Sequence, residues 1–163
     1  MASRLLFRPA VRCEPGTVYS ILASCYAELL DSAFEHRLRE FDRNVFDNPD
    51  TIGTCTLVSS VDSDIVGLVS YDPRQGPHVG IIGHNGVLPP YRGQGYGTRQ
   101  IAEIVRIFRA RGFDRARVST SEHPFFGPAR RMYEACGFRE CSSTEPSNEG
   151  EYRIIHYEMS LTK

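Results

Sequence analysis

The sequence predicts a single domain with a mixed α/β fold of the α+β type, in which a mostly antiparallel sheet is flanked by helices. The length of 163 residues suits one domain, since domains usually hold about 100–200 residues. Hydrophobic residues make up 40% of the chain and charged residues 24%, which is typical of a globular protein. Segments with strand character come first and are followed by helix, strand, helix and strand, an order that does not favour a uniform parallel sheet.

The first part of the chain predicts one short strand and two helices. Residues 5–8 form the strand, which Pro9 ends. Residues 14–17 form a turn, after which apolar side chains recur at helical spacing as far as Cys25. A second helix is predicted within residues 29–46, before the turn-forming sequence Asp-Asn-Pro-Asp.

The middle of the chain predicts three strands. Two runs rich in β-branched residues, 54–60 and 65–71, predict a hairpin because Asp-Ser-Asp lies between them. A third strand is predicted within residues 78–87. The two prolines that follow it end the strand, because proline donates no hydrogen bond to a sheet.

The second half predicts helices at 98–111 and 128–136 and strands at 115–120 and 152–159. The first of these helices is the clearest, because its apolar residues form one stripe and a glycine follows its last turn. The stripe consists of Ile101, Ile104, Val105 and Phe108.

The net charge of −1 argues against general binding to nucleic acids or membrane surfaces, both of which call for a basic excess. The charges are nevertheless uneven. Residues 89–131 contain nine arginines against Glu103, Asp114 and Glu122, which gives this stretch a net charge of +6. The stretch indicates either a site for a polyanionic ligand or a solvated, arginine-rich helix face.

The five cysteines favour neither a disulfide framework nor a zinc site, because their number is odd and no two are spaced as CxxC. We expect reduced thiols in a cytoplasmic protein that needs no metal. No apolar stretch approaches the roughly 20 residues of a membrane span. Arginines interrupt the N-terminal segment where a secretory signal would need an apolar core.

Three glycines at alternate positions, Gly93, Gly95 and Gly97, connect the strand at 78–87 to the clearest helix. Glycine lets a backbone turn tightly and approach a ligand closely, and the first N–H groups of a helix bind anions such as pyrophosphate. The sequence lacks the GxxxxGK[ST] pattern of a P-loop and the GxGxxG pattern of a dinucleotide-binding fold. The glycines alone fit a pyrophosphate site and a structural turn equally well.

The surroundings of the glycines make the pattern more specific. Arg92, Gly95 and Gly97 are spaced as Arg-x-x-Gly-x-Gly, and a Val-x-Pro sequence beginning at Val87 precedes them. Residues 133–138 then read Tyr-Glu-Ala-Cys-Gly-Phe. Together these elements resemble the GNAT superfamily of N-acetyltransferases. The resemblance implies a twisted, mostly antiparallel central sheet with flanking helices, and acetyl-CoA bound where two central strands splay apart.

The resemblance also implies roles for the residues around the glycines. The pyrophosphate of acetyl-CoA is assigned to backbone amides from Arg92 to Thr98, and the acetyl carbonyl to the N–H of Val87, with the pantetheine arm along the strand. Many relatives carry Asn seven residues before the helix tyrosine, where this chain has Phe126. The cofactor-binding residues implied are Val87, Leu88, Arg92, Gly93, Gln94, Gly95, Tyr96, Gly97 and Thr98.

Two residues are candidates for proton transfer. The resemblance makes Tyr133 the general acid that protonates the departing CoA sulfur, the alternative being a packed aromatic on its helix. His84 lies on the strand just before Val87 and is a candidate base for the amine, the alternative being a hydrogen-bonded structural histidine. Glu122 and His123 are weaker candidates for the base.

These features predict an N-acetyltransferase that moves an acetyl group from acetyl-CoA to a primary amine by direct attack in a ternary complex. The amine is that of a small molecule or of a peptide or protein, and the acidic balance of residues 28–50 favours a cationic one. The main alternative is a non-catalytic, regulatory module that binds acyl-CoA. A nucleotide- or nucleic-acid-binding module fits less well. The partners expected are acetyl-CoA and the acceptor, without nucleic acid or membrane, in a monomer or a homodimer.

Overall fold

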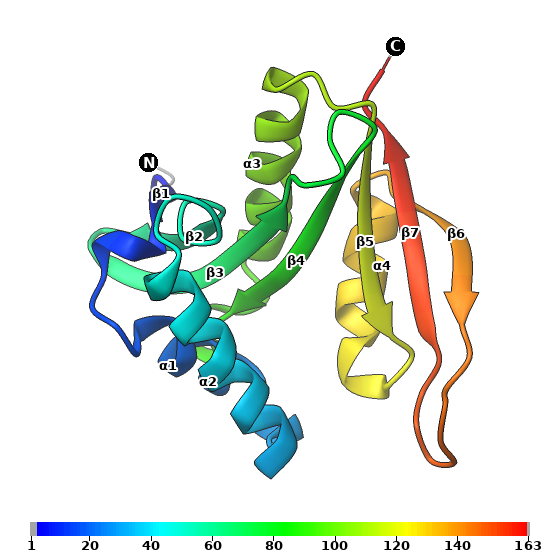
Figure 1. Cartoon of the computed structure of the whole chain (residues 1–163), viewed down its shortest axis with the longest axis horizontal. Helices are drawn as coiled ribbons and strands as arrows, with labels where there is room; N and C mark the ends of the chain where they lie inside the picture. Colours follow the sequence, from blue (N-terminus) through cyan, green and yellow to red (C-terminus); the bar gives the residue numbers. More distant parts are fainter. Residues whose placement is uncertain (1–2, 163) are drawn as a thin grey trace. The chain divides into compact units, whose positions relative to one another are not determined.

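The computed structural model describes residues 3–162, which divide by their contacts into two compact units. The first unit comprises the chain as far as Tyr71 together with His84–Gln100. The second comprises Asp72–Gly83 and the chain from Ile101 onward. Two strands and one helix contribute residues to both units, and each unit is described in turn (Figure 1).

The first unit holds three complete or nearly complete strands, two helices and the end of a fourth strand. Its regular elements are β1 (Leu6–Pro9), α1 (Thr17–Cys25), α2 (Ser32–Asp47), β2 (Thr56–Val61), β3 (Asp64–Asp72) and the last residues of β4 (Val79–Val87). Single 3₁₀ turns, η1 (Ala10–Arg12), η2 (Ala27–Leu29) and η3 (Pro89–Tyr91), occur in its connections. The first residues of α3 (Tyr96–Ala110) also belong to this unit.

The second unit holds the beginning of β4, the rest of α3, a second helix and three further strands. These elements are β5 (Arg115–Ser121), the 3₁₀ turn η4 (Pro124–Phe126), α4 (Gly127–Ala135), β6 (Arg139–Thr144) and β7 (Ile154–Ser160). In Figure 1, β7 runs between β5 and β6, as its antiparallel pairing with both strands requires.

Seven strands follow one another in the hydrogen-bonded order β1-β2-β3-β4-β5-β7-β6. β4 and β5 pair in parallel, with Val79 opposite Arg115 and Ile82 opposite Val118. The pairs β1–β2, β2–β3, β5–β7 and β6–β7 are antiparallel. The predicted fold class, a mostly antiparallel sheet with flanking helices, is confirmed.

The predicted elements are present, with boundaries that differ by a few residues. α3 begins at Tyr96 rather than at residue 98, because Gly97 and Thr98 already form its first turn. The strand β6 was not predicted, since its residues are polar and exposed throughout and show no alternation of apolar and polar side chains.

The core of the first unit lies between the two helices and the hairpin of β2 and β3. One face of α1 and of α2 packs against Val58 of β2 and Leu68 of β3, all fully buried or nearly so. Such burial stabilises the unit by roughly 1.5–3 kcal/mol for each large apolar side chain. The helix residues in this cluster are Val18, Ile21, Leu22, Cys25, Leu38 and Val45.

A carboxylate of α2 caps the first turn of α1. The residue before α1, Gly16, has φ of +94° and no side chain to cap the helix. The buried side chain of Asp42 instead accepts the N–H of Gly16 at 3.1 Å and the N–H of Tyr19 at 2.9 Å. A negative charge at a helix N-terminus is favourable. This contact therefore caps the start of α1 and also joins α1 to α2.

The helices α3 and α4 end in the same way. In α4, Gly137 has φ of +100°, its N–H donates to the carbonyl of Glu134, and the N–H of Phe138 donates to the carbonyl of Tyr133. The rings of Tyr133 and Phe138 lie 6.1 Å apart. Hydrogen bonds and an apolar contact in this pattern define the Schellman ending of a helix. The Tyr-Glu-x-x-Gly-Phe pattern therefore has a local structural cause.

We predict that Asp42→Ala lowers the free energy of unfolding by about 1–3 kcal/mol, because two N–H groups at the start of α1 lose a buried acceptor. Asp42→Asn should cost less, since its amide oxygen still accepts one of them. Asp47→Ala, which removes an exposed carboxylate from the same helix, is the matched control. Chemical denaturation measures all three variants, and equal stability of Asp42→Ala and Asp47→Ala would contradict the capping role.

Candidate functional site

The loop between η3 and α3 is shaped by two glycines in the left-handed region. Gly93 has φ of +74° and Gly95 has φ of +83°, a conformation that costs other residues energy. A Cβ atom built on either glycine would meet no atom within 4 Å. The loop therefore offers open space directly above its backbone, where a ligand can approach the main chain.

The start of α3 presents main-chain donors beside these glycines. The N–H of Arg99 donates to the carbonyl of Gly95 at 3.1 Å. The N–H groups of Tyr96, Gly97 and Thr98 precede this bond, and a helix supplies no acceptor for its first N–H groups. They carry the positive end of the helix dipole, so the loop and the first turn suit an anion.

Arg92 braces the loop from within. Its guanidinium donates to the carbonyl of Cys25 at 2.6 Å, at the end of α1, and to the carbonyl of Val87 at 3.2 Å, at the end of β4. Its own N–H donates to the carbonyl of Pro89 at 3.3 Å. The arginine predicted from the motif thus joins α1, β4 and the loop, and its own N–H is bound within the loop.

The last residues of β4 alternate between two faces of the sheet. His84, Gly86 and Leu88 share one face, since they lie two residues apart. A Cβ atom on Gly86 would lie 2.9 Å from the sulfur of Cys25, so glycine allows α1 to pack on the strand at this point. Leu88 also packs against the core of α1 and α2.

His84 is held by polar and aromatic neighbours. Its N–H donates to the Oγ of Ser70 at 2.8 Å, and its Nδ1 lies 3.2 Å from the hydroxyl of Tyr26. The ring centroid of Phe41 is 4.8 Å away. Burial lowers the pKa of His84 from 6.5 to about 4, because the charged form loses hydration. The imidazole is therefore neutral at physiological pH.

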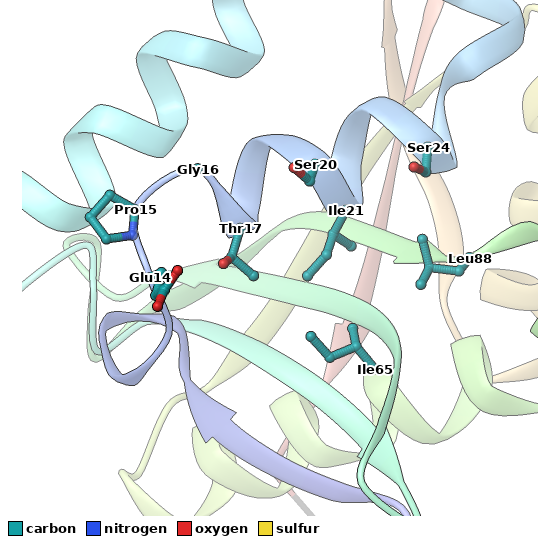
Figure 2. A pocket seen from close by; sticks show the side chains of 9 residues that line it. All are labelled: Glu14, Pro15, Gly16, Thr17, Ser20, Ile21, Ser24, Ile65 and Leu88. Carbon is teal, nitrogen blue, oxygen red and sulfur yellow. The ribbon is translucent and has the colours of Figure 1, made fainter.

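A groove of about 470 Å³ opens between α1 and the sheet (Figure 2). Ile21 points from α1 toward Ile65, with Leu88 beside them. Leu88 belongs both to this lining and to the predicted cofactor-binding residues. His84 lies four residues earlier in the strand, roughly 13 Å away at about 3.3 Å per residue, and Cys25 packs on Gly86 between them. The groove is therefore separate from the surroundings of His84.

The predicted site residues fall into both units. His84 and the nine predicted cofactor-binding residues, Val87 to Thr98, lie in the first unit. Tyr133 lies on α4 in the second unit, where it is 5% exposed and its ring is 6.1 Å from those of Phe138 and Tyr157.

Three further residues singled out in the sequence, Glu122, His123 and Phe126, have partners close by in the chain or in the second unit. Glu122 pairs with Arg153, whose hydrogen bond lowers the pKa of the carboxyl group and so weakens it as a base. The Nδ1 of His123 accepts the N–H of Phe125 at 3.0 Å. Phe126 is half-buried, with its ring centroid 5.0 Å from that of Phe125.

Several charged residues in the acidic stretch 28–50 and in the basic stretch 89–131 make local contacts within the protein. In residues 28–50, Asp31 caps α2 by accepting the N–H of Phe34 at 2.7 Å, and Glu35 pairs with Arg39 at 3.0 Å. In the basic stretch, Arg106 pairs with Glu103 at 2.7 Å. Each of these two ion pairs lies within a single stretch, so the net charge of that stretch is unchanged and its excess charge is carried by other residues.

Sequence reasoning missed Gln100, which is fully buried on α3 next to the predicted apolar stripe. Its carboxamide contacts β2, β3 and β4. The sequence does contain a signal for it, because a polar residue directly precedes Ile101 and lies four residues before Ile104 on the same side of the helix.

Two kinds of feature are absent from residues 3–162. No helix among them has the length and apolarity that crossing a membrane requires. No group of three or more His, Cys, Asp or Glu side chains in this part of the chain is placed to hold a metal ion.

Comparison with solved structures finds the same fold in several acetyltransferases. A protein from Desulfovibrio desulfuricans assigned to the GNAT family superposes with a TM-score of 0.80 at 20% identity, covering 98% of this chain and 100% of that chain. The ribosomal-protein-S18-alanine N-acetyltransferase from Escherichia coli gives 0.71 at 14% identity, with coverage of 98% and 96%. An aminoglycoside 6'-N-acetyltransferase complexed with coenzyme A gives 0.71 at 16% identity, with coverage of 97% and 98%.

The match of a family model adds the class of protein to the fold, an acyltransferase that uses acetyl-CoA. The sequence model of the acetyltransferase (GNAT) family matches residues 17–138, and the chain belongs to that family. No curated protein matches the sequence. The family uses acetyl-CoA. The predictions of the family, of acyltransferase activity and of acetyl-CoA are confirmed.

We predict that His84 makes the protein less stable as the pH falls from about 6.5 to 4. The unfolded chain takes up a proton near pH 6.5, whereas the folded chain resists it until about pH 4, so unfolding is favoured in between. The loss should reach about 2 kcal/mol, allowing for the partial exposure of the ring.

Denaturation at pH 7 and pH 4.5 tests this prediction. His84→Gln, which does not titrate, should lose less stability between the two values than the wild type. His36→Gln, at an exposed histidine, should behave like the wild type. An equal loss in all three proteins would contradict the prediction.

Proposed function

We propose that this protein is an N-acetyltransferase that transfers the acetyl group of acetyl-CoA directly to a primary amine. The observation that carries the proposal is the loop before α3, where Gly93 and Gly95 have positive φ and leave the backbone open. The diphosphate of acetyl-CoA would accept hydrogen bonds from the amides of the loop and of the first helical turn. Arg92 would keep these amides in place through its contacts with Cys25 and Val87.

The N–H of Val87 would polarise the thioester. The next amide, that of Leu88, donates to the carbonyl of Val66 at 2.8 Å, and successive amides of a strand point to opposite edges. The N–H of Val87 is therefore directed away from β3. A fixed donor of this kind stabilises the negative charge that develops on the carbonyl oxygen, commonly by a few kcal/mol.

His84 would receive the proton of the attacking amine. With Nδ1–H donating to the oxygen of Tyr26, 3.2 Å away, the lone pair of Nε2 is available to accept a proton. The pKa of about 4 keeps this lone pair free at neutral pH, although it makes the imidazole a weak base. His84 then serves best as a relay that passes the proton onward.

Tyr133 would donate its phenolic proton to the sulfur of the departing CoA. The support is its place in the Tyr-Glu-x-x-Gly-Phe pattern at the end of α4, together with the family to which the chain belongs. The alternative, a packing role, rests on the ring contacts with Phe138 and Tyr157.

Direct transfer is favoured over an acyl-enzyme by the state of Cys25, the thiol that packs on Gly86 beside Val87. Burial raises the pKa of Cys25 to about 11, although Arg92 opposes the shift. A protonated thiol is a poor nucleophile. Cys25 is therefore unsuited to carry the acetyl group, and the amine would attack acetyl-CoA itself.

The acceptor is proposed to be a primary amine, of a small molecule or of a peptide or protein. Among proteins of the same fold, one is named for an alanine of a ribosomal protein and another for an aminoglycoside. A non-catalytic module that binds acyl-CoA is the second candidate, and the family's acyltransferase activity disfavours it.

We predict that mixing the protein with acetyl-CoA and a panel of primary amines releases free CoA thiol only when an acceptor amine is present. Tyr133→Phe should lower kcat about 10²-fold or more, the usual range for loss of a general acid, while the Kd for acetyl-CoA changes little. Thiol release and calorimetric binding measure the two quantities.

Tyr157→Phe is the matched control, since it removes the hydroxyl of a neighbouring buried tyrosine and should keep the wild-type kcat. Full activity of Tyr133→Phe would remove Tyr133 from the mechanism. Stabilisation by acetyl-CoA with no amine-dependent thiol release across the panel would favour the binding module.

A further inference from the structure

Gln100 is a polar residue in a fully buried position. It lies on the second turn of α3, directly before the apolar stripe, and its exposed fraction is 0%. A buried carboxamide is costly unless its polar atoms are hydrogen-bonded. Within residues 3–162, every buried side-chain nitrogen and oxygen has a hydrogen-bond partner. The partners of Gln100 therefore indicate why a glutamine occupies this position.

The carboxamide of Gln100 reaches three strands. Its Oε1 accepts the hydroxyl of Ser59 on β2 at 2.5 Å. Its Nε2 donates to the carbonyl of Leu68 on β3 at 3.3 Å. On β4 the same nitrogen lies 2.7 Å from the Oδ1 of Asn85 and 3.2 Å from the carbonyl of Gly86. A single side chain thus ties the start of α3 to the strand that precedes the loop.

The carbonyls of Leu68 on β3 and Gly86 on β4 both accept from Nε2 of Gln100, so the carboxamide lies close to both strands. Space for the carboxamide comes from Gly67. A Cβ atom there would lie 2.3 Å from the carbonyl oxygen of Gly86 and 2.5 Å from Oε1 of Gln100. No larger residue at position 67 is compatible with this arrangement.

The carbonyl of Gly86 and the N–H of Val87 belong to one peptide group. A trans peptide is planar, so its C=O and N–H point in opposite directions and move together. Gln100 fixes the direction of the carbonyl and thereby the direction of the N–H. A hydrogen bond accepted by the carbonyl also polarises the N–H of the same peptide and strengthens it as a donor.

We infer that Gln100 is a positioning residue for acetyl transfer, which aims and strengthens the Val87 N–H by binding the carbonyl of Gly86. The inference rests on the proposed contact between this N–H and the thioester carbonyl. Gln100 touches neither substrate. Its effect passes through the peptide group between Gly86 and Val87.

The test combines kinetics with the infrared band of the thioester carbonyl in bound, ¹³C-acetyl-labelled acetyl-CoA. In the wild type, the Val87 N–H should move this band to lower frequency than in free acetyl-CoA. Gln100→Leu removes the donor, so the shift should shrink and kcat should fall about tenfold or more. The Kd for CoA, which has no acetyl carbonyl, should stay within about twofold of the wild-type value.

Two variants complete the design. Gln100→Met keeps a side chain of similar length without an N–H donor, and should behave like Gln100→Leu. Ser59→Ala removes the partner of Oε1 and leaves the Nε2 bonds, so it should keep the wild-type band and kcat.

The possible outcomes distinguish the Val87 contact with the thioester from the role of Gln100. A wild-type band at the free frequency would remove the Val87 contact and this inference with it. A shifted wild-type band that Gln100→Leu and Gln100→Met leave unchanged would overturn the role of Gln100 alone. Loss of folding in both variants, or parallel losses of kcat and CoA affinity, would assign Gln100 to stability and also overturn it.

Discussion

The structure around the candidate site depends on main-chain N–H groups at the beginning of α3 that receive no hydrogen bond acceptor from the helix itself. Every helix has such groups, and most are capped by a neighbouring side chain or by water. Here Gly93 and Gly95 hold the preceding loop in the left-handed region with open space above it. The donors are thus left facing outward, and an anionic ligand is the partner that the helix dipole favours.

The start of α1 meets the same requirement in the opposite way. Asp42 of α2 enters the core and accepts two of its first N–H groups, so this helix end is closed to ligands. Asp42 caps the start of α1, whereas the start of α3 is the ligand site that we propose. Arg92 connects the two regions, since it binds the last carbonyl of α1 and the last carbonyl of β4.

Much of this arrangement follows from local patterns. The spacing of Arg92, Gly95 and Gly97, and the stripe that begins at Ile101, identified the loop and its helix, because turn chemistry and helical periodicity are properties of neighbouring residues. The family and the fold class follow from the same stretch. The sequence also predicted the end of α4, where Gly137 allows the Schellman ending.

Other features depend on residues far apart in the chain, which local patterns do not connect. Asp42 appeared as one acidic residue in an acidic region, yet it caps a helix 23 and 26 residues away. Gln100 meets Ser59 across 41 residues. The edge strand β6 is exposed along its whole length, so it lacks the alternation that reveals a half-buried strand. In each case tertiary contacts decide the outcome.

In the mechanism that we propose, main-chain donors of the loop and of the first turn of α3 hold the diphosphate of CoA. Amide chemical shifts of the ¹⁵N-labelled protein, recorded during titration with CoA and with pantetheine, test it most directly. We expect large shifts for the amides of residues 93–98 with CoA and small ones with pantetheine, which lacks the diphosphate. Equal shifts with the two compounds, or none at these residues, would contradict it.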